Sequence, residues 1–283
     1  MKTLLVPVLG HDGLRAIVDT ACLAGQRFDS IIEACSFRHA LADYLRGNAA
    51  GNLPWHFEEQ VRASDLARAE DLARKQVFAH AMETRGMREE AAPGLGVCFR
   101  WRAEPLCGDH VLGQQARLFS ATVIGQPEST GASPEMATFE TLLFESGRPV
   151  LIAPPAAPAS LGESILIAWN GSTETARTIA FAEPFLRRAR RIWVLAIEGS
   201  SVPGPSAQEL AEALNRAGIA AEARTLTSSR FSSGEVFLAE AQALSSDLLI
   251  KGAYTQSRLR QMFFGGATSH ILRHAKLPVL MAH

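Results

Sequence analysis

The sequence has little excess charge and no long apolar run, and both absences narrow what the protein can do. Its Lys and Arg residues number 28 against 29 Asp and Glu, a formal net charge of −1, and the two signs are mixed along the chain. Such a balance creates no field that attracts nucleic acid. No apolar stretch reaches the roughly 20 residues that a membrane helix needs, and the start MKTLLVPVLG is too brief for a signal peptide. We therefore expect a cytoplasmic protein that binds neither nucleic acid nor membrane.

Cysteine is scarce and shows no pairing pattern. Cys22, Cys35, Cys98 and Cys107 all lie in the first half of the chain, and no CxxC occurs. Without a disulfide framework or a zinc-type spacing, these residues are expected to be buried free thiols, which fits a reducing compartment.

Motifs of catalysis and metal binding are also missing. The sequence contains no GxxxxGK[ST], no GxSxG and no HExxH, which excludes P-loop, α/β-hydrolase and zincin chemistry at the level of motifs. His270 and His274 are four residues apart on a predicted helix, but no third ligand is evident, so solvent-facing histidines are the preferred interpretation. Ser172 is expected to start a helix rather than act as a nucleophile, because nothing places a His and an Asp beside it.

An internal repeat organises what is present. The 283 residues have room for two domains of ordinary size. Three segments of the first half recur in the same order in the second half. Leu4–Gly10 corresponds to Ile165–Gly171, Ala121–Gly125 corresponds to Leu248–Gly252, and Gly147–Ala153 corresponds to Leu277–Ala282. The segment APPAAPAS at 153–160 has the composition of a linker. These repeats predict a duplicated unit, with domains at 1–155 and 161–283.

Strand and helix patterns alternate in both halves, which predicts an α/β fold with a parallel sheet and helices on both faces. The expected strands of the second half are 165–169, 191–197, 221–226, 248–252 and 279–281, with helices at 174–187, 206–217, 234–244 and 268–275. The first half predicts strands at 3–8, 30–35, 97–102 and 122–125, a closing strand near 150, and helices at 14–26, 63–85 and 136–145. The stretch 37–60 has no counterpart in the second half and is expected to be an irregular insertion that covers an edge or an interface.

A glycine-rich segment near the end of the chain has the pattern of an anion site. The apolar run Leu248–Ile250 stops at Gly252, and the pair Gly265 and Gly266 comes directly before a predicted helix. Glycines at this point leave backbone N–H groups and the positive end of the helix dipole open to an anion. A phosphate group suits such a place.

This segment resembles the C-terminal signature of the universal stress protein family, in which Gly, two residues, Gly, nine residues and Gly are followed by Ser or Thr. Gly252 and Gly265 fit the first and third glycines at the required spacing. Thr255 stands at the second glycine, and Gly266 stands where Ser or Thr is usual. Thr268 matches a hydroxyl that nucleotide-binding members also use.

The resemblance implies two tandem Rossmann-like domains of the adenine nucleotide alpha hydrolase-like type. Each would be a five-stranded parallel sheet of order 3-2-1-4-5 with helices on both faces. The two halves are expected to pack as a pseudo-twofold pair that mimics the dimer common in the family, and a homodimer of whole chains is also compatible. Two separate sheets of similar halves are expected, and a single continuous sheet or dissimilar halves would make the family assignment fail.

The resemblance also implies ATP as the ligand of the second half, with Mg²⁺ able to accompany it and slow hydrolysis as the most activity to expect. Asn170 stands where ATP-binding members usually have Asp, and Arg258 or Arg260 would fold over the anion. The expected binding residues are Ala168, Asn170, Ile197, Gly252, Thr255, Ser257, Arg258, Gly265, Gly266, Ala267 and Thr268.

Two functions of different classes stay open. The first is a stress-response effector that binds ATP or a related adenine nucleotide in its second half. The second is a stress-response interaction or scaffold protein that has lost nucleotide binding and holds another small anionic ligand or none. The first half is expected to lack a family-type site, because Leu9 replaces the polar residue after its first strand and no glycine stands near Thr138. His11 and Asp12 are expected to lie in an exposed turn.

Overall fold

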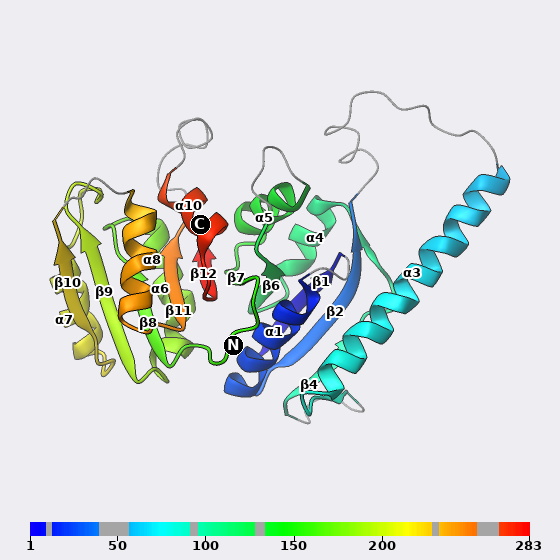
Figure 1. Ribbon diagram of the computed structural model, residues 1–283, viewed down its shortest axis with the longest axis horizontal. Coiled ribbons are helices and arrows are strands. Elements are labelled where there is room, and N and C mark those ends of the chain that lie inside the picture. The colour runs from blue at the N-terminus through cyan, green and yellow to red at the C-terminus, as the bar shows by residue number, and fades with distance from the viewer. Residues whose placement is uncertain (10–12, 40–56, 91–95, 128–133, 228–231, 254–265) are drawn as a thin grey trace.

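The computed structural model describes residues 1–9, 13–39, 57–90, 96–127, 134–227, 232–253 and 266–283. A twelve-stranded, mostly parallel sheet runs across the molecule, with helices on both of its faces (Figure 1). The predicted α/β class is therefore confirmed.

Both halves contribute strands and helices in alternation. The strands of the first half are β1 (Thr3–Val8), β2 (Ile31–Arg38), β3 (Arg88–Glu89), β4 (Cys98–Trp101), β5 (Leu106–Cys107), β6 (Ala121–Gly125) and β7 (Val150–Ala153). Those of the second half are β8 (Ser164–Ala168), β9 (Arg191–Ile197), β10 (Glu222–Leu226), β11 (Leu248–Gly252) and β12 (Val279–Ala282). The helices are α1 (Leu14–Phe28), α3 (Phe57–Glu83), α4 (Asp109–Ala116), α5 (Pro134–Glu145), α6 (Thr173–Leu186), α7 (Ala207–Arg216), α8 (Ser233–Ala243) and α10 (Ala267–His274).

The strand order is the same in the two halves. The second half runs β10-β9-β8-β11-β12, which is 3-2-1-4-5 when its strands are counted in chain order. The first half runs β4-β2-β1-β6-β7, again 3-2-1-4-5, with the short β3 added beside β4 and β5 paired with β2 off the main path. The predicted duplication of one module is therefore present in the topology.

The two modules do not keep separate sheets, so that expectation was wrong. Strand β12 pairs with β7 in antiparallel register, with Leu280 opposite Leu151, whereas the other pairs of the sheet are parallel. The fifth strand of each module is an edge strand with unpaired N–H and C=O groups, and pairing the two edges satisfies them. Because two equivalent edges related by a twofold rotation meet antiparallel, the continuous sheet agrees with the duplication instead of opposing it.

Helices cover both faces of the sheet because its strands are apolar on both sides. One buried cluster lies under α1, α3, α6 and α7 and includes Leu4, Val6 and Ile165. The other lies under α4, α5, α8 and α10 and includes Leu5 and Leu166. Each cluster runs through both halves, so the halves share their cores.

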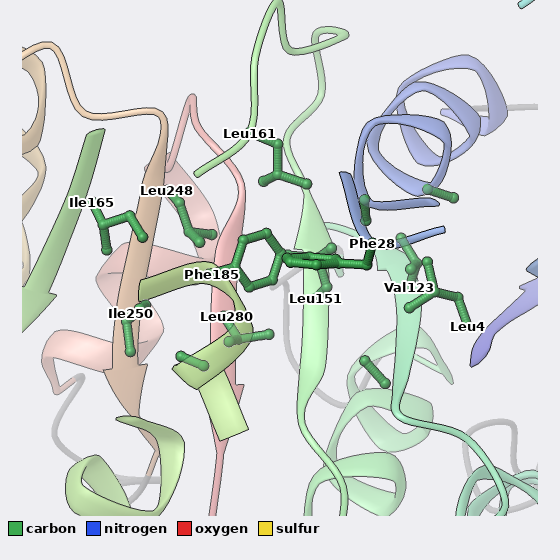
Figure 2. Close-up of a cluster of buried hydrophobic side chains, with 14 of the residues drawn as sticks. Leu4, Phe28, Val123, Leu151, Leu161, Ile165, Phe185, Leu248, Ile250 and Leu280 are labelled. Carbon is green, nitrogen blue, oxygen red and sulfur yellow. The ribbon is translucent and has the colours of Figure 1, made fainter. Parts of the chain in front are cut away.

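Aromatic and charged contacts also join the halves. The rings of Phe28 at the end of α1 and Phe185 in α6 meet edge to face, with centroids 4.6 Å apart, above the strands that carry Leu151 and Leu280 (Figure 2). Nearby, Arg27 pairs with Glu163 at 2.5 Å and donates to the carbonyl oxygens of residues 162 and 188. This geometry favours one rigid arrangement of the two modules.

Some local predictions need correction. Helix α3 begins at Phe57, inside the stretch expected to be an irregular insertion, and β2 continues to Arg38; residues 40–56 of that stretch lie outside the described residues. Helix α4 was not predicted, because it has only eight residues and contains Gly113. Cys107 is exposed, whereas the other three cysteines are buried as expected.

Replacing Phe185 by Ala tests the shared core. Phe185 has no exposed surface, so its loss leaves a cavity between the modules and should lower the free energy of unfolding by about 3 to 5 kcal/mol. Leu118→Ala is the control, because Leu118 is 73% exposed, and it should change stability by less than about 0.5 kcal/mol. Chemical denaturation followed by circular dichroism measures both. Two separate transitions in the wild type would contradict a shared core.

Candidate functional site

The site region lies where the strand order of the second half reverses. Strands β8 and β11 are neighbours, with Ile167 opposite Ile250, but β8 leads through α6 toward β9 while β11 leads through α10 toward β12 on the other side. The carboxyl ends of two such strands diverge into helices on opposite faces, and ligands of doubly wound sheets bind there. The first turns of α6 and α10 therefore flank the end of β11.

Gly252, the last residue of β11, allows a very close approach of α6. A Cβ atom on Gly252 would lie 2.3 Å from the backbone nitrogen of Thr175 and 2.6 Å from the carbonyl carbon of Glu174. The space beside the Gly252 Cα atom is occupied by the first turn of α6. The glycine is thus required for packing of the helix on the strand, whatever its role toward a ligand.

Polar groups in the turn after β8 bind the start of α6. The Oδ1 atom of Asn170 accepts hydrogen bonds from the Thr175 hydroxyl at 2.7 Å and from the Ser172 backbone nitrogen at 3.2 Å. The Ser172 hydroxyl accepts from the Thr175 backbone nitrogen, which makes Ser172 the N-cap of α6, as expected. The amide oxygen of Asn170 is therefore directed toward the start of α6 and holds the N-cap residue in place.

The loop after β9 packs onto this turn. The backbone nitrogen of Val202 donates to the carbonyl of Asn170 at 2.9 Å, and the indole of Trp169 donates to the carbonyl of Pro205 at 2.8 Å. At Gly204 a Cβ atom would lie 2.6 Å from the carbonyl oxygen of Gly171. The two loops form one packed unit beside the ends of β8 and β9.

Helix α10 starts differently from its neighbours. Helices α7 and α8 each have a Ser cap with a reciprocal Glu bond, Ser206 with Glu209 and Ser232 with Glu235. Helix α10 has Gly266 at its N-cap, no acidic residue in its first turn, and no capping bond from a described side chain. Its first N–H groups and the positive end of its dipole are therefore left to another partner.

The structure brings a residue to this place that the sequence analysis did not select. The side chain of Lys251 is only 7% exposed, and its Nζ atom donates to the carbonyl of Gly252 at 2.8 Å and to the Thr268 hydroxyl at 3.0 Å. Thr268 lies in the first turn of α10. The signal was a charged residue inside the otherwise apolar strand LLIKG, where charge is costly unless it has a partner.

The surroundings of Lys251 and of Glu174 shift the pKa values of both groups. Desolvation lowers the pKa of Lys251 to about 8, although the carboxylate of Glu174 acts in the opposite direction. Burial also acts to raise the pKa of Glu174, but hydrogen bonds from its own backbone and from the Thr173 hydroxyl hold that pKa below the ordinary value. Both groups are therefore charged at neutral pH, and no described carboxylate forms an ion pair with Lys251.

The predicted binding residues fall into three groups. Gly252, Gly266, Ala267 and Thr268 gather with Asn170 around the ends of β8 and β11. Ala168 and Ile197, which end β8 and β9, are 2% and 4% exposed and contribute to the core. The remaining residues lie outside the described ranges: Thr255, Ser257, Arg258, Arg260 and Gly265, and so do His11 and Asp12 of the first half.

A cavity of about 800 Å³ opens at the corresponding strand ends of the first half. Val8 and Ile124 form part of its wall, Glu135 adds a carboxylate, and Leu272 and Arg273 reach it from α10 of the second half. Its lining is mostly apolar. The prediction that this half lacks a family-type nucleotide site stays a prediction.

Metal and membrane features were searched among the described residues. His270 and His274 stack with centroids 4.3 Å apart, and no group of three or more metal-ligating side chains occurs in this part of the chain. None of the described helices combines the length and the apolar character that crossing a membrane requires.

Gly252→Ala tests the contact between β11 and α6. The new methyl group would lie within 2.3 Å of the Thr175 backbone nitrogen, so α6 must move, and we expect a loss of about 3 kcal/mol in unfolding free energy. Gly266→Ala is the matched control, because its Cβ would meet nothing within 4 Å, and it should cost less than about 1 kcal/mol. Equal losses in urea denaturation would contradict the packing role.

Lys251→Met tests the cost of the buried charge. The folded-state pKa of about 8 lies below the ordinary 10.5, so the unfolded chain binds more protons between these values and wild-type stability should rise with pH through that window. At pH 7 the variant should be more stable by about 2 kcal/mol, after allowance for the lost hydrogen bonds. The gap should narrow toward pH 10. A variant that is less stable at pH 7 would show that the ammonium is stabilised by the fold itself.

Comparison with known proteins identifies a sequence family and solved structures to which this chain is similar. A sequence model of the universal stress protein family matches residues 163–283. No curated protein has a matching sequence. Among solved structures, a universal stress protein from Archaeoglobus fulgidus DSM 4304 is similar with a TM-score of 0.71 and 14% identity, over 99% of this chain and 95% of that one. A functionally unknown protein from Pseudomonas aeruginosa PAO1 is similar with a TM-score of 0.52 and 14% identity, over 100% and 92%.

The family match covers the whole of the second module, from β8 to β12, and the structural similarity extends the same architecture over the first. Residues 163–283 therefore form a domain of the universal stress protein family, and the first module of the chain shares its fold.

Proposed function

We propose that the protein is a stress-response effector whose second domain binds ATP or a related adenine nucleotide by its phosphate groups. The proposed place is the end of β11, between the first turns of α6 and α10. Family membership supports the class of ligand, and the polar groups at this edge of the sheet support the position.

One observation carries the proposal. The ammonium group of Lys251 is buried beside the first turn of α10, where the helix dipole also presents positive charge, and its hydrogen bonds go to neutral oxygens. Two positive groups held together in a region of low dielectric favour an anion between them. A phosphate group has the charge and the acceptor oxygens that this arrangement needs.

The described residues divide the binding tasks. The N–H groups of Ala267 and Thr268 would donate to phosphate oxygens at the start of α10, and the Lys251 ammonium would add charge. Asn170 brings no charge of its own, and its Oδ1 atom already accepts from the Ser172 backbone. Any Mg²⁺ would be bound by the phosphates, because the described part of the chain offers no cluster of three ligand side chains.

Hydrolysis would be slow at most. The Ser172 and Thr175 hydroxyls bond to each other at 3.1 Å and to the start of α6, and the Thr173 hydroxyl donates to the Glu174 carboxylate beside it, so these contacts of the described residues hold the helix start in place. The protein would then change between nucleotide-bound and nucleotide-free forms by binding and release rather than by hydrolysis.

A second candidate is an interaction or scaffold role without nucleotide. Helix α3 projects past the body of the molecule (Figure 1) and exposes Leu66, Leu72 and Val77 by 65%, 57% and 41%. Large apolar side chains on a projecting helix favour contact with another protein. The hydrogen bonds of Asn170 to the start of α6 are also compatible with a site that has lost its ligand.

Titration calorimetry with ATP separates the two candidates. Gly266→Trp places a large ring at the start of α10, where a Cβ meets nothing within 4 Å, so the fold tolerates it while the phosphate position is blocked. ATP affinity should fall at least about tenfold, equivalent to about 1.4 kcal/mol. Gln208→Trp on the exposed side of α7 is the control and should bind like the wild type. No heat from the wild type at millimolar ATP would remove the nucleotide proposal and leave the interaction role.

A further inference from the structure

We propose that Lys251 makes the second-domain site selective for charge: its buried ammonium group binds a phosphate group of the ligand, so a nucleotide is preferred over the same nucleoside without phosphate. The inference rests on the proposed function for its location. It assigns recognition to a residue outside the glycine pattern of the family signature.

The first step is the geometry of the donors. A lysine ammonium has three N–H donors, and the hydrogen bonds of Lys251 within the described residues use two, on the carbonyl of Gly252 and the hydroxyl of Thr268. The third donor has no partner among the residues that the structure describes. Because the Thr268 oxygen accepts from Lys251, its own hydrogen is free to be donated elsewhere, and Thr268 lies in the first turn of α10. The two side chains offer two donors side by side at a helix N-terminus.

The second step is the charge balance. Lys251 lies in the core with 7% of its surface exposed, and no described acidic group pairs with it directly. Glu174 acts on it through space, but its side chain accepts a hydrogen bond from Thr173 within α6. A buried charge beside the positive end of a helix is unfavourable without an anion, whereas an apolar side chain of similar length would be accommodated without that cost. The position of Lys251 therefore points to a bound anion.

The third step concerns the other titratable groups around this point. Glu174 in α6 acts on Lys251 and His283 after β12 acts on Glu174, whereas His270 in α10 and Glu235 in α8 act on each other. The pKa values of both carboxyls are held below the ordinary range, and burial lowers the pKa of His270. These carboxyls stay ionised and His270 stays neutral at mildly alkaline pH. Lys251 is the lysine whose pKa burial brings to about 8, so its protonation governs the positive charge there.

A pH dependence follows from this arrangement. A bound phosphate favours the ammonium form of Lys251, so the pKa of Lys251 is higher in the complex than in the free protein. At a pH where the free protein has lost this proton, binding of the phosphate requires the protein to take the proton up again, which weakens binding. Affinity for a phosphorylated ligand should therefore fall by about tenfold as the pH rises from about 7.5 to 9.5. The affinity for an uncharged nucleoside should not change across the same range.

The experiment compares Lys251→Met with Lys276→Met, a control that removes the same charge from an exposed position at the far end of α10. Calorimetry at the two pH values measures binding of ATP, adenosine and inorganic triphosphate to the full chain. We expect Lys251→Met to lose at least about tenfold in affinity for ATP and for triphosphate, to keep its affinity for adenosine, and to lose the pH dependence. Lys276→Met should behave like the wild type.

Each outcome decides a separate point. Unchanged ATP affinity and an unchanged pH profile in Lys251→Met overturn the role of Lys251 and leave the nucleotide site in place. Binding of triphosphate, dependent on Lys251, without preference for ATP supports the inference and overturns the adenine nucleotide as ligand. No binding of any probe to the wild type overturns both. Should Lys251→Met fail to fold, the wild-type pH series decides alone, and a constant ATP affinity overturns the inference.

Discussion

The architecture depends on the antiparallel pairing of β7 with β12. Through this one junction the seven strands of the first module and the five of the second become a single sheet, and the apolar clusters on both faces become continuous across it. The ring contact of Phe28 with Phe185 and the bonds of Arg27 to the second module then add to an interface that the sheet has already aligned. Satisfying two strand edges at once is a strong constraint, because an edge left open invites pairing with other chains.

The same constraint positions the site. Within the second module, β8 and β11 lie between paired neighbours, so their ends cannot shift, and Gly252 lets α6 pack directly on the end of β11. Lys251 is one residue earlier on the same strand and extends to α10. A charge placed on such a rigid strand is preorganised, and a ligand that binds it does not need to order it first.

The sequence predicted the main strands because apolar runs and glycine ends repeat between the halves, and the resemblance to the universal stress protein family implied their order. It failed where local signals are weak or tertiary contacts decide. Helix α4 is short and contains Gly113, so its eight residues give no clear period. Ala168 and Ile197 were predicted as ligand contacts from their place at strand ends, and the fold shows that both are buried, which the sequence pattern did not indicate; their contact with a ligand stays a prediction. Lys251 was readable as a charge in an apolar strand, yet only the fold shows that it meets Thr268.

The two modules are joined in one chain, so the second module does not depend on a separate partner to pair its edge strand. Association with a separate partner depends on the concentration of that partner. The first module, in contrast, lies beside the edge strand of the second module whenever the chain is folded. Its stoichiometry is fixed at one to one, and its contribution is the edge strand β7 and the core behind it. At the strand ends of this first copy lies a mostly apolar cavity, and Leu272 and Arg273 of the second copy form part of its wall, so the fused copies share a surface that neither encloses by itself.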